Sequence, residues 1–363
     1  MQIKAKITPF QFYTMLYLGR IFSHIAYISN IRVQFSSEET IYGMILMGVY
    51  LLLTSVPILY MMRKDMESSI ITRAECISKG FSKALCVIFL LDFYIYAILS
   101  AGRFELFVSS VMFPETNMAI VVITLLAASA YSAYKGIEAI GRAGIVFLVP
   151  VLFSFAFVFL SLIKDVDPLN YTPMLSADIG KISGIGLYTC SRTAEILAAA
   201  ILLPFVKNQK KGHLPMWILI ITLTFIITTL VLEGVLGAYN KTQLFGMYTL
   251  AVLAEFEFIE RLDALISCIW MICAIIKLSV IFFICDYLFT QLFKKKKRLL
   301  YLLISIAVIF TGTRVVSRNI LDFSVIITSP LTTVIYLLSV VGLPILIIIL
   351  EKIKERRNAH AKA

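Results

Sequence analysis

Apolar stretches of about 20 residues, the length that a helix needs to cross a hydrocarbon core, recur along the whole chain. Several of them carry no charged residue, for example 40–62 and 143–163. Hydrophobic residues make up 60% of the 363 residues and charged residues 15%, and the mean hydropathy is +0.91. A soluble domain of this length cannot bury that much apolar surface. The sequence therefore predicts an all-α, polytopic membrane protein.

We predict about ten membrane-spanning helices in a single permease-like domain that extends over residues 1–363. No long linker, low-complexity tract or soluble domain separates the spans. A five-plus-five division gives one repeat over about 9–163, a second over about 183–350 and a tail over 351–363. The expected spans are 9–29, 41–62, 83–112, 117–134, 143–163, 183–204, 214–236, 261–290, 299–316 and 325–350.

Lysine and arginine residues alternate between the two sides of these spans. One set of loops, together with both termini, holds 22 of the 33 basic residues, whereas the other loops hold 7 and the spans hold 4. Because cytoplasmic loops are enriched in Lys and Arg, this bias predicts that both termini are cytoplasmic. The net charge of +11 thus reflects topology, and we expect no nucleic-acid partner.

Sequence motifs for catalysis or metal binding are missing. The chain has no glycine-rich phosphate loop, no nucleophile elbow and no histidine pair at metal-ligand spacing. Its six cysteines lie mostly in apolar runs without paired spacing, and it has only three histidines. We therefore expect no enzymatic activity, no cofactor and no metal site.

The sixth span, 183–204, carries a charged side chain near its middle. Arg192 lies among small and hydroxyl-bearing residues, and Glu195 follows it closely. A charge at this depth costs at least about 2.5 to 3.5 kcal/mol on insertion scales. The pattern is typical of an interrupted helix whose freed backbone groups and charge face a cavity. A continuous helix with an Arg192–Glu195 pair is the alternative.

The first span contains a similar step at Gly19 and Arg20. Arg20 lies about 17 Å from the start of the span at 1.5 Å per residue, near the midplane. Arg192 lies at a comparable depth from the opposite face. Matching polar steps in the first helices of two halves with opposite topology are typical of inverted-repeat transporters. Two unrelated polar positions in a bundle are the alternative, and His24 alone supports no site.

Lys277 lies 16 residues past Arg261 in the eighth span, too deep for its side chain to reach either surface easily. It therefore needs a counter-charge, a ring of carbonyl groups or the loss of its proton. A cation fixed there can take the place of Na⁺ in a transporter or serve as a proton carrier. A purely structural pair with Glu195 or Glu233 is the alternative.

Several motifs point to a known family. They are F-P-E-T-N at 113–117, Y-K-G-I-E-A-I-G-R at 134–142, P-L-N-Y-T-P-M-L at 168–175, E-R-L-D at 260–263 and I-I-K-L-S at 275–279. With these motifs, and with Arg103 in the third span, the chain resembles the B subunit of bacterial spore germinant receptors. These are the endospore germination permeases of the amino acid–polyamine–organocation superfamily.

This resemblance implies a fold like that of the leucine transporter, with the first and sixth spans interrupted and a ligand site between them. It also implies an amino-acid-like germinant, receptor A and C subunits as partners, and the spore inner membrane with its lipids as the location. We therefore expect a germinant-sensing, permease-like subunit that binds its ligand near the bilayer midplane. An active proton-coupled amino acid or amine transporter is the alternative.

These considerations select two groups of candidate residues. We expect a carboxylate or other anionic group of the ligand to meet Arg192. The candidate ligand-binding residues are Leu18, Gly19, Arg20, Cys190, Ser191, Arg192, Thr193 and Glu195. The candidate ion-site or coupling residues are Lys277, Arg103 and Glu233.

Overall fold

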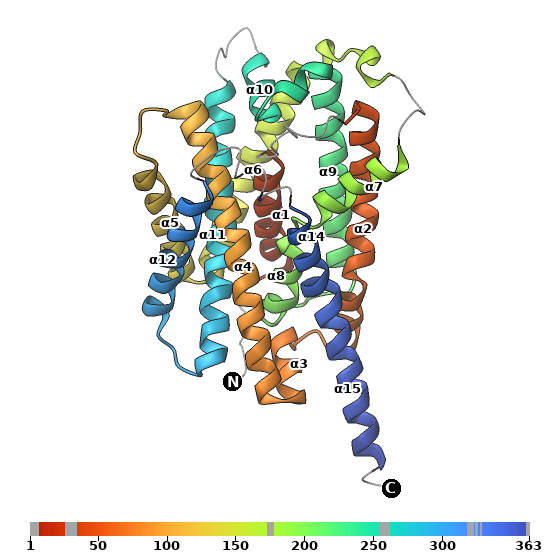
Figure 1. The fold of residues 1–363 in the computed structure, drawn as a ribbon, viewed down its shortest axis with the longest axis vertical. Helices are drawn as coiled ribbons and strands as arrows, with labels where there is room; N and C mark the ends of the chain where they lie inside the picture. Colours follow the sequence, from red (N-terminus) through yellow and green to blue (C-terminus); the bar gives the residue numbers. More distant parts are fainter. Residues whose placement is uncertain are drawn as a thin grey trace.

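The structure is a computed structural model that describes residues 7–25, 35–172, 178–254, 262–317, 323, 326 and 329–360. Long helices form a bundle, and both ends of the chain lie at the same end of it (Figure 1). The helices are α1 (Pro9–Ile25), α2 (Ser37–Lys64), α3 (Ile70–Ile77), α4 (Lys79–Phe107), α5 (Met118–Lys135), α6 (Ile137–Ser161), α7 (Ile179–Cys190), α8 (Ala194–Leu202), α9 (His213–Leu236), α10 (Gly246–Leu253), α11 (Leu262–Phe293), α12 (Arg298–Val316), α14 (Pro330–Leu337) and α15 (Leu343–His360).

Nine helical segments in the described ranges are long and apolar enough to cross a membrane. They correspond to the second through tenth predicted spans, with α7 and α8 counted together and α14 and α15 joined by a π-helical turn, Leu338–Gly342. The first span is α1, of which 17 residues are described, and its predicted end at 26–29 lies outside the described residues. The all-α polytopic fold is thus confirmed.

Three elements differ from the predicted spans or lie between them. The connection after the second span forms the short helix α3, which we did not predict. Helix α10 forms in the loop before the eighth span. Helix α15 continues through 351 to His360, and the division into a span and a tail at this point stays a prediction.

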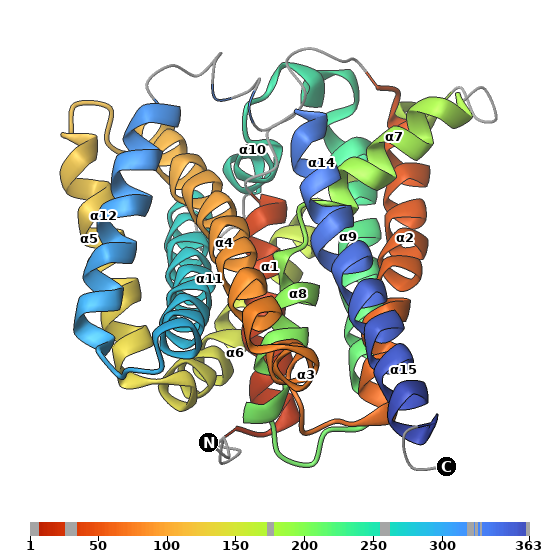
Figure 2. The same ribbon diagram turned by 60° about the horizontal axis from the view of Figure 1, so that its bottom comes forward.

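Helices α1 and α8 lie in the middle of the bundle, between α4 and α11 on one side and α2 and α9 on the other (Figure 2). All nine residues of α8 are buried, and four of them are alanines. Small residues allow membrane helices to approach one another closely. Further out, α5 packs on α11 while α12 packs on α4. This exchange of partners is the arrangement expected if the two halves are related repeats, which remains a prediction.

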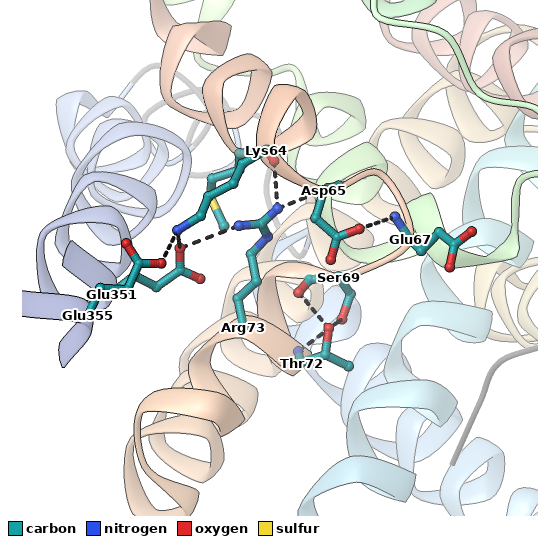
Figure 3. Close-up of polar contacts among 9 residues, drawn as sticks. Lys64, Asp65, Glu67, Ser69, Thr72, Arg73, Glu351 and Glu355 are labelled. Atoms are coloured by element: carbon teal, nitrogen blue, oxygen red, sulfur yellow. Dashed lines mark hydrogen bonds and ion pairs between the residues drawn. The ribbon is translucent and has the colours of Figure 1, made fainter. Parts of the chain in front are cut away.

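The C-terminal helix α15 is tied to the connection between α2 and α3 (Figure 3). Arg73 of α3 donates hydrogen bonds to the carbonyl oxygens of Met61 at 2.6 Å and Asp65 at 2.9 Å, and it forms an ion pair with Glu351 at 3.4 Å. Lys64 forms a second ion pair with Glu351, at 3.5 Å. Arg73 thus satisfies carbonyl groups at the end of α2 and neutralises a charge on α15.

Candidate functional site

The sixth span is interrupted at the predicted position. Helix α7 ends at Cys190, α8 begins at Ala194, and Thr193 between them has a non-helical backbone (φ −97°, ψ 78°). The residues around this break are almost completely buried. A helix end leaves its last carbonyl groups without partners in the helix, and in a buried site other groups must supply them.

Side chains satisfy the carbonyl groups at this break. Two of the donors come from distant helices, namely Arg20 in α1 and Tyr96 in α4. The hydrogen bonds run from Arg20 Nη2 to Thr189 O (2.8 Å), from Arg20 Nη1 to Arg192 O (3.1 Å), from the Tyr96 hydroxyl to Ser191 O (3.0 Å) and from Arg192 Nη1 to Tyr188 O (2.8 Å). These side-chain donors therefore stabilise the non-helical backbone at the break.

Arg20 is the most buried of these donors, with 1% of its surface exposed. Besides the two carbonyl groups, its guanidinium lies 4.8 Å from the centre of the Phe225 ring and 3.6 Å from Met47 Sδ. His24, one turn further along α1, stacks on the same ring. Arg20 therefore joins α1 to the break as a structural cation.

Helix α1 differs from the expected pattern at this point. It continues without a break through Leu18, Gly19 and Arg20, where we predicted an interruption. The carbonyl groups that accept hydrogen bonds from Arg20 belong to the α7–α8 break. Because those partners come from outside α1, this helix does not need to open to accommodate the cation.

Arg192 folds back over its own helix. Its guanidinium carbon lies 3.4 Å from the centre of the Tyr188 ring, and Nη1 also donates to Ser191 Oγ at 2.8 Å. Its surface is 7% exposed. No pair with Glu195 is needed to bury Arg192, since the backbone, a hydroxyl group and an aromatic face surround its charge.

Lys277 of α11 joins three helices at the same level. Its Nζ forms an ion pair with Glu195 of α8 at 2.8 Å and donates to Ser23 Oγ at 2.7 Å and to Gly19 O at 3.3 Å, both in α1. Both partners of the ion pair are about 95% buried. Lys277 thus contacts the first span, and of the two predicted partners it is Glu195 that pairs with it.

A small cavity lies beside this ion pair, between α1, α4, α8 and α11. Its volume is about 20 Å³, and Glu195 and Lys277 both line it. Oxygen Oε2 of Glu195 is buried and accepts no hydrogen bond from the residues that the structure describes. A space of this size accommodates about one water molecule. The structure thus shows the polar centre of the bundle in a closed form.

Several hydroxyl groups lie beside the break on the side of α2 and α14. The Tyr336 hydroxyl lies 2.9 Å from Thr54 Oγ1 and 3.5 Å from Cys190 Sγ, and Thr333 Oγ1 lies 3.1 Å from Ser191 Oγ. Hydroxyl groups both donate and accept, so they can rearrange their hydrogen bonds around a polar ligand.

The structure does not bring every candidate residue into this cluster. Glu233 lies near the far end of α9, where Asn240 donates to its Oε1 at 2.9 Å, so it is not the partner of Lys277. Arg103 is buried in the last turns of α4. Within the described ranges, no three His, Cys, Asp or Glu residues gather closely enough to hold a metal ion.

Sequence reasoning missed several residues of the site. Ser23 lies four residues after Gly19, and Tyr188 lies four residues before Arg192. Residues at this spacing share one face of a helix, so the helical period could have found both. Tyr96, Thr333 and Tyr336 come from other helices, and no local pattern in the sequence links them to the break.

Comparisons with known proteins bear on the family and the fold of the chain. A family model described as spore germination protein matches residues 6–320. No curated protein sequence matches the chain significantly. Among solved structures, that of MhsT in complex with L-phenylalanine aligns with a TM-score of 0.64 and 13% identity, covering 96% of this chain and 99% of that one.

A Na⁺-coupled sialic acid symporter, solved in a substrate-bound outward-open state, aligns with a TM-score of 0.59 and 14% identity. The alignment covers 93% of this chain and 79% of the symporter. At these identities the likeness shows a shared fold. Together with the family match over most of its length, it establishes that the chain belongs to the spore germination protein family and has the fold of these membrane transporters.

Proposed function

We propose that the protein is a germinant-sensing, permease-like subunit of a spore germination receptor that binds an amino-acid-like molecule at the α7–α8 break. The break with its two guanidinium groups, Arg20 and Arg192, is the observation that carries this proposal. It brings two cationic side chains and four hydrogen-bonded backbone carbonyl groups together near the middle of the bundle. MhsT, which has the same fold, is described in complex with L-phenylalanine.

The charge balance of the site favours an anionic group on the ligand. Arg20, Arg192 and Lys277 bring three cations, whereas Glu195 brings one carboxylate that already pairs with Lys277. An entering carboxylate is attracted to the two guanidinium groups that lie together at the break. Arg192 is the residue that we assign to this contact, because its side chain is less buried than that of Arg20, at 7% exposed against 1%.

The setting of the protein follows from the same proposal. We place it in the spore inner membrane with its basic loops and both termini in the cytoplasm, beside the A subunit and the lipoprotein C subunit. We also propose that it forms one domain with repeats at about 9–163 and 183–350. Uptake of labelled amino acids into proteoliposomes separates this sensor from a proton-coupled transporter, since only the transporter accumulates substrate.

The test of the site is the germination response of spores that carry Arg192→Ala. A desolvated ion pair is worth about 2 to 5 kcal/mol when one partner is removed, so the germinant concentration for half-maximal response should rise more than tenfold. Arg192→Lys keeps the charge but loses the planar fork, and it should give an intermediate shift.

Arg142→Ala is the matched control. Its side chain is exposed and pairs with Glu138 one turn away on the same helix, so its removal should leave the response unchanged. Immunoblots of spore membranes verify that each variant is present in normal amount. An unchanged dose response for Arg192→Ala at normal abundance would return Arg192 to a structural role.

A further inference from the structure

An apolar cavity lies on the flank of the bundle, away from the break. Helices α1, α6 and α9 form its walls, and its volume is about 380 Å³. Nearly all the side chains that line it are apolar or aromatic, with Tyr13 from α1, Leu152 from α6 and Ile220 from α9 as examples. A volume of this size falls in the range of small-molecule sites, about 300 to 1,000 Å³.

The cavity opens towards the surroundings of the bundle. Of the side chains that line it, Phe10 is 61% exposed and Met216 is 56% exposed. Helices α6 and α9 are among the segments that are long and apolar enough to span a membrane. Their outer surfaces therefore face lipid, and the molecules that reach this opening are those of the bilayer.

One of the two tryptophans forms part of the wall. Trp217 lines the cavity and is 3% exposed, and its Nε1 is buried. The other tryptophan, Trp270, donates to the Phe22 carbonyl oxygen at 3.2 Å. Trp217 therefore contributes an aromatic surface to the cavity, and Trp270 does not line it.

The end of the cavity nearest the α8–α9 loop is basic. His213, one turn before Trp217, accepts a hydrogen bond at Nδ1 from the backbone N–H of Lys210, which leaves the ring hydrogen on Nε2 when the ring is neutral. Lys210 and Lys211 are exposed beside it.

We propose that this cavity binds one anionic phospholipid in a defined orientation. The phosphate contacts His213, Lys210 and Lys211, and the acyl chain continues past the Trp217 ring along Leu152 and Ile220. Trp217 lies four residues, or about 6 Å, deeper than His213, so its ring contacts the part of the lipid beyond the phosphate. This site is independent of the proposed germinant site.

Tryptophan fluorescence in lipid nanodiscs tests this proposal, because the chain has only two tryptophans. Brominated phosphatidylglycerol or brominated phosphatidylcholine is added in small mole fractions to a phosphatidylcholine bilayer, since bromine quenches tryptophan on contact. We expect phosphatidylglycerol to reach half-maximal quenching at a mole fraction at least tenfold lower. Each lysine near a membrane surface strengthens anion binding roughly fivefold, so Lys210→Gln/Lys211→Gln should abolish this preference.

Two single-tryptophan variants locate the signal. Trp270→Phe should keep the quenching, whereas Trp217→Phe should lose it, because Trp270 is fully buried between Phe22, Phe104 and Phe107. If Trp270→Phe fails to fold, the unmodified chain gives the same contrast over a constant background from Trp270. Equal quenching by both lipids, or a preference that survives loss of both lysines, would overturn the proposal.

Discussion

Removing the charge of Lys277 should destabilise the bundle more than any other single substitution in the polar centre. The ammonium group makes three contacts of 2.7 to 3.3 Å, with Glu195, Ser23 and Gly19. Lys277→Met preserves the length of the side chain but leaves the Glu195 carboxylate buried without a cation. Breaking a buried ion pair on one side costs about 3 to 5 kcal/mol. The thermal denaturation midpoint of the purified protein in detergent should fall accordingly.

The double variant Lys277→Met/Glu195→Gln separates the cost of an orphaned charge from the loss of packing. Replacing both partners of a buried pair with neutral groups is often nearly neutral for stability. Most of the lost thermal stability should therefore return in the double variant, with Glu195→Gln alone as the reference. If Lys277→Met is as stable as the unmodified protein, the ion pair does not hold the three helices together.

The same position distinguishes a structural charge from a proton carrier. Lys277→Arg keeps the charge but changes its shape and does not release a proton at physiological pH. If the charge is structural, Arg should partly preserve germination and Met should abolish it, without any dependence on Na⁺ because the ammonium already binds the oxygen atoms. If proton exchange is required, both variants should fail although the protein reaches the membrane. Normal germination with Met at this position would exclude both roles.

Two further predictions concern the orientation and the C-terminal helix. A cysteine at Lys210 should resist impermeant thiol reagents in intact cells while one at the exposed Lys164 should react, and the reverse labelling pattern would invert the proposed topology. Glu351→Gln removes the ionic partner of the buried Arg73 and should lower stability by about 1.5 to 3 kcal/mol in thermal melts. Glu355→Gln, whose partner Lys64 is exposed (Figure 3), should cost under about 1 kcal/mol. Equal losses in the two variants would contradict the importance of the Arg73 contact.

Most of the fold could be predicted because membrane solvation acts locally on the sequence. The apolar length of each span and the basic loops between spans are visible in single segments, so the boundaries of α9 and α12 agree with the prediction within about two residues, as helix ends usually allow. The break in the sixth span was also predictable, since Arg192 among small residues has few ways to be buried. Helix α3 was missed because its eight residues are too short to give a spanning signal.

The partners of the buried charges could not be predicted in the same way. Lys277 had two candidate anions at suitable depth, and only the packing of α8 against α11 selects Glu195 over Glu233. Arg20 binds the carbonyl oxygen of Arg192, 172 positions away in the sequence. Every residue has a backbone carbonyl group, so the sequence does not show which of them accepts a hydrogen bond from a buried charge. This is why a charge can be recognised as buried while its acceptor remains unknown until the helices are placed.

The hydrogen bonds already made by the buried donors limit what the proposed ligand site can recognise. In related arrangements, carbonyl groups at a helix break are acceptors for a cation, and an amino-acid ammonium is one such cation. Here Arg20 already donates to two of these carbonyl groups, and Tyr96 donates to a third. An ammonium group must therefore displace a fixed guanidinium, whereas a carboxylate can accept hydrogen bonds from guanidinium groups at the break. We infer that the proposed ligand is selected mainly through its anionic group, and that Arg20 fixes the shape of the break that this group enters.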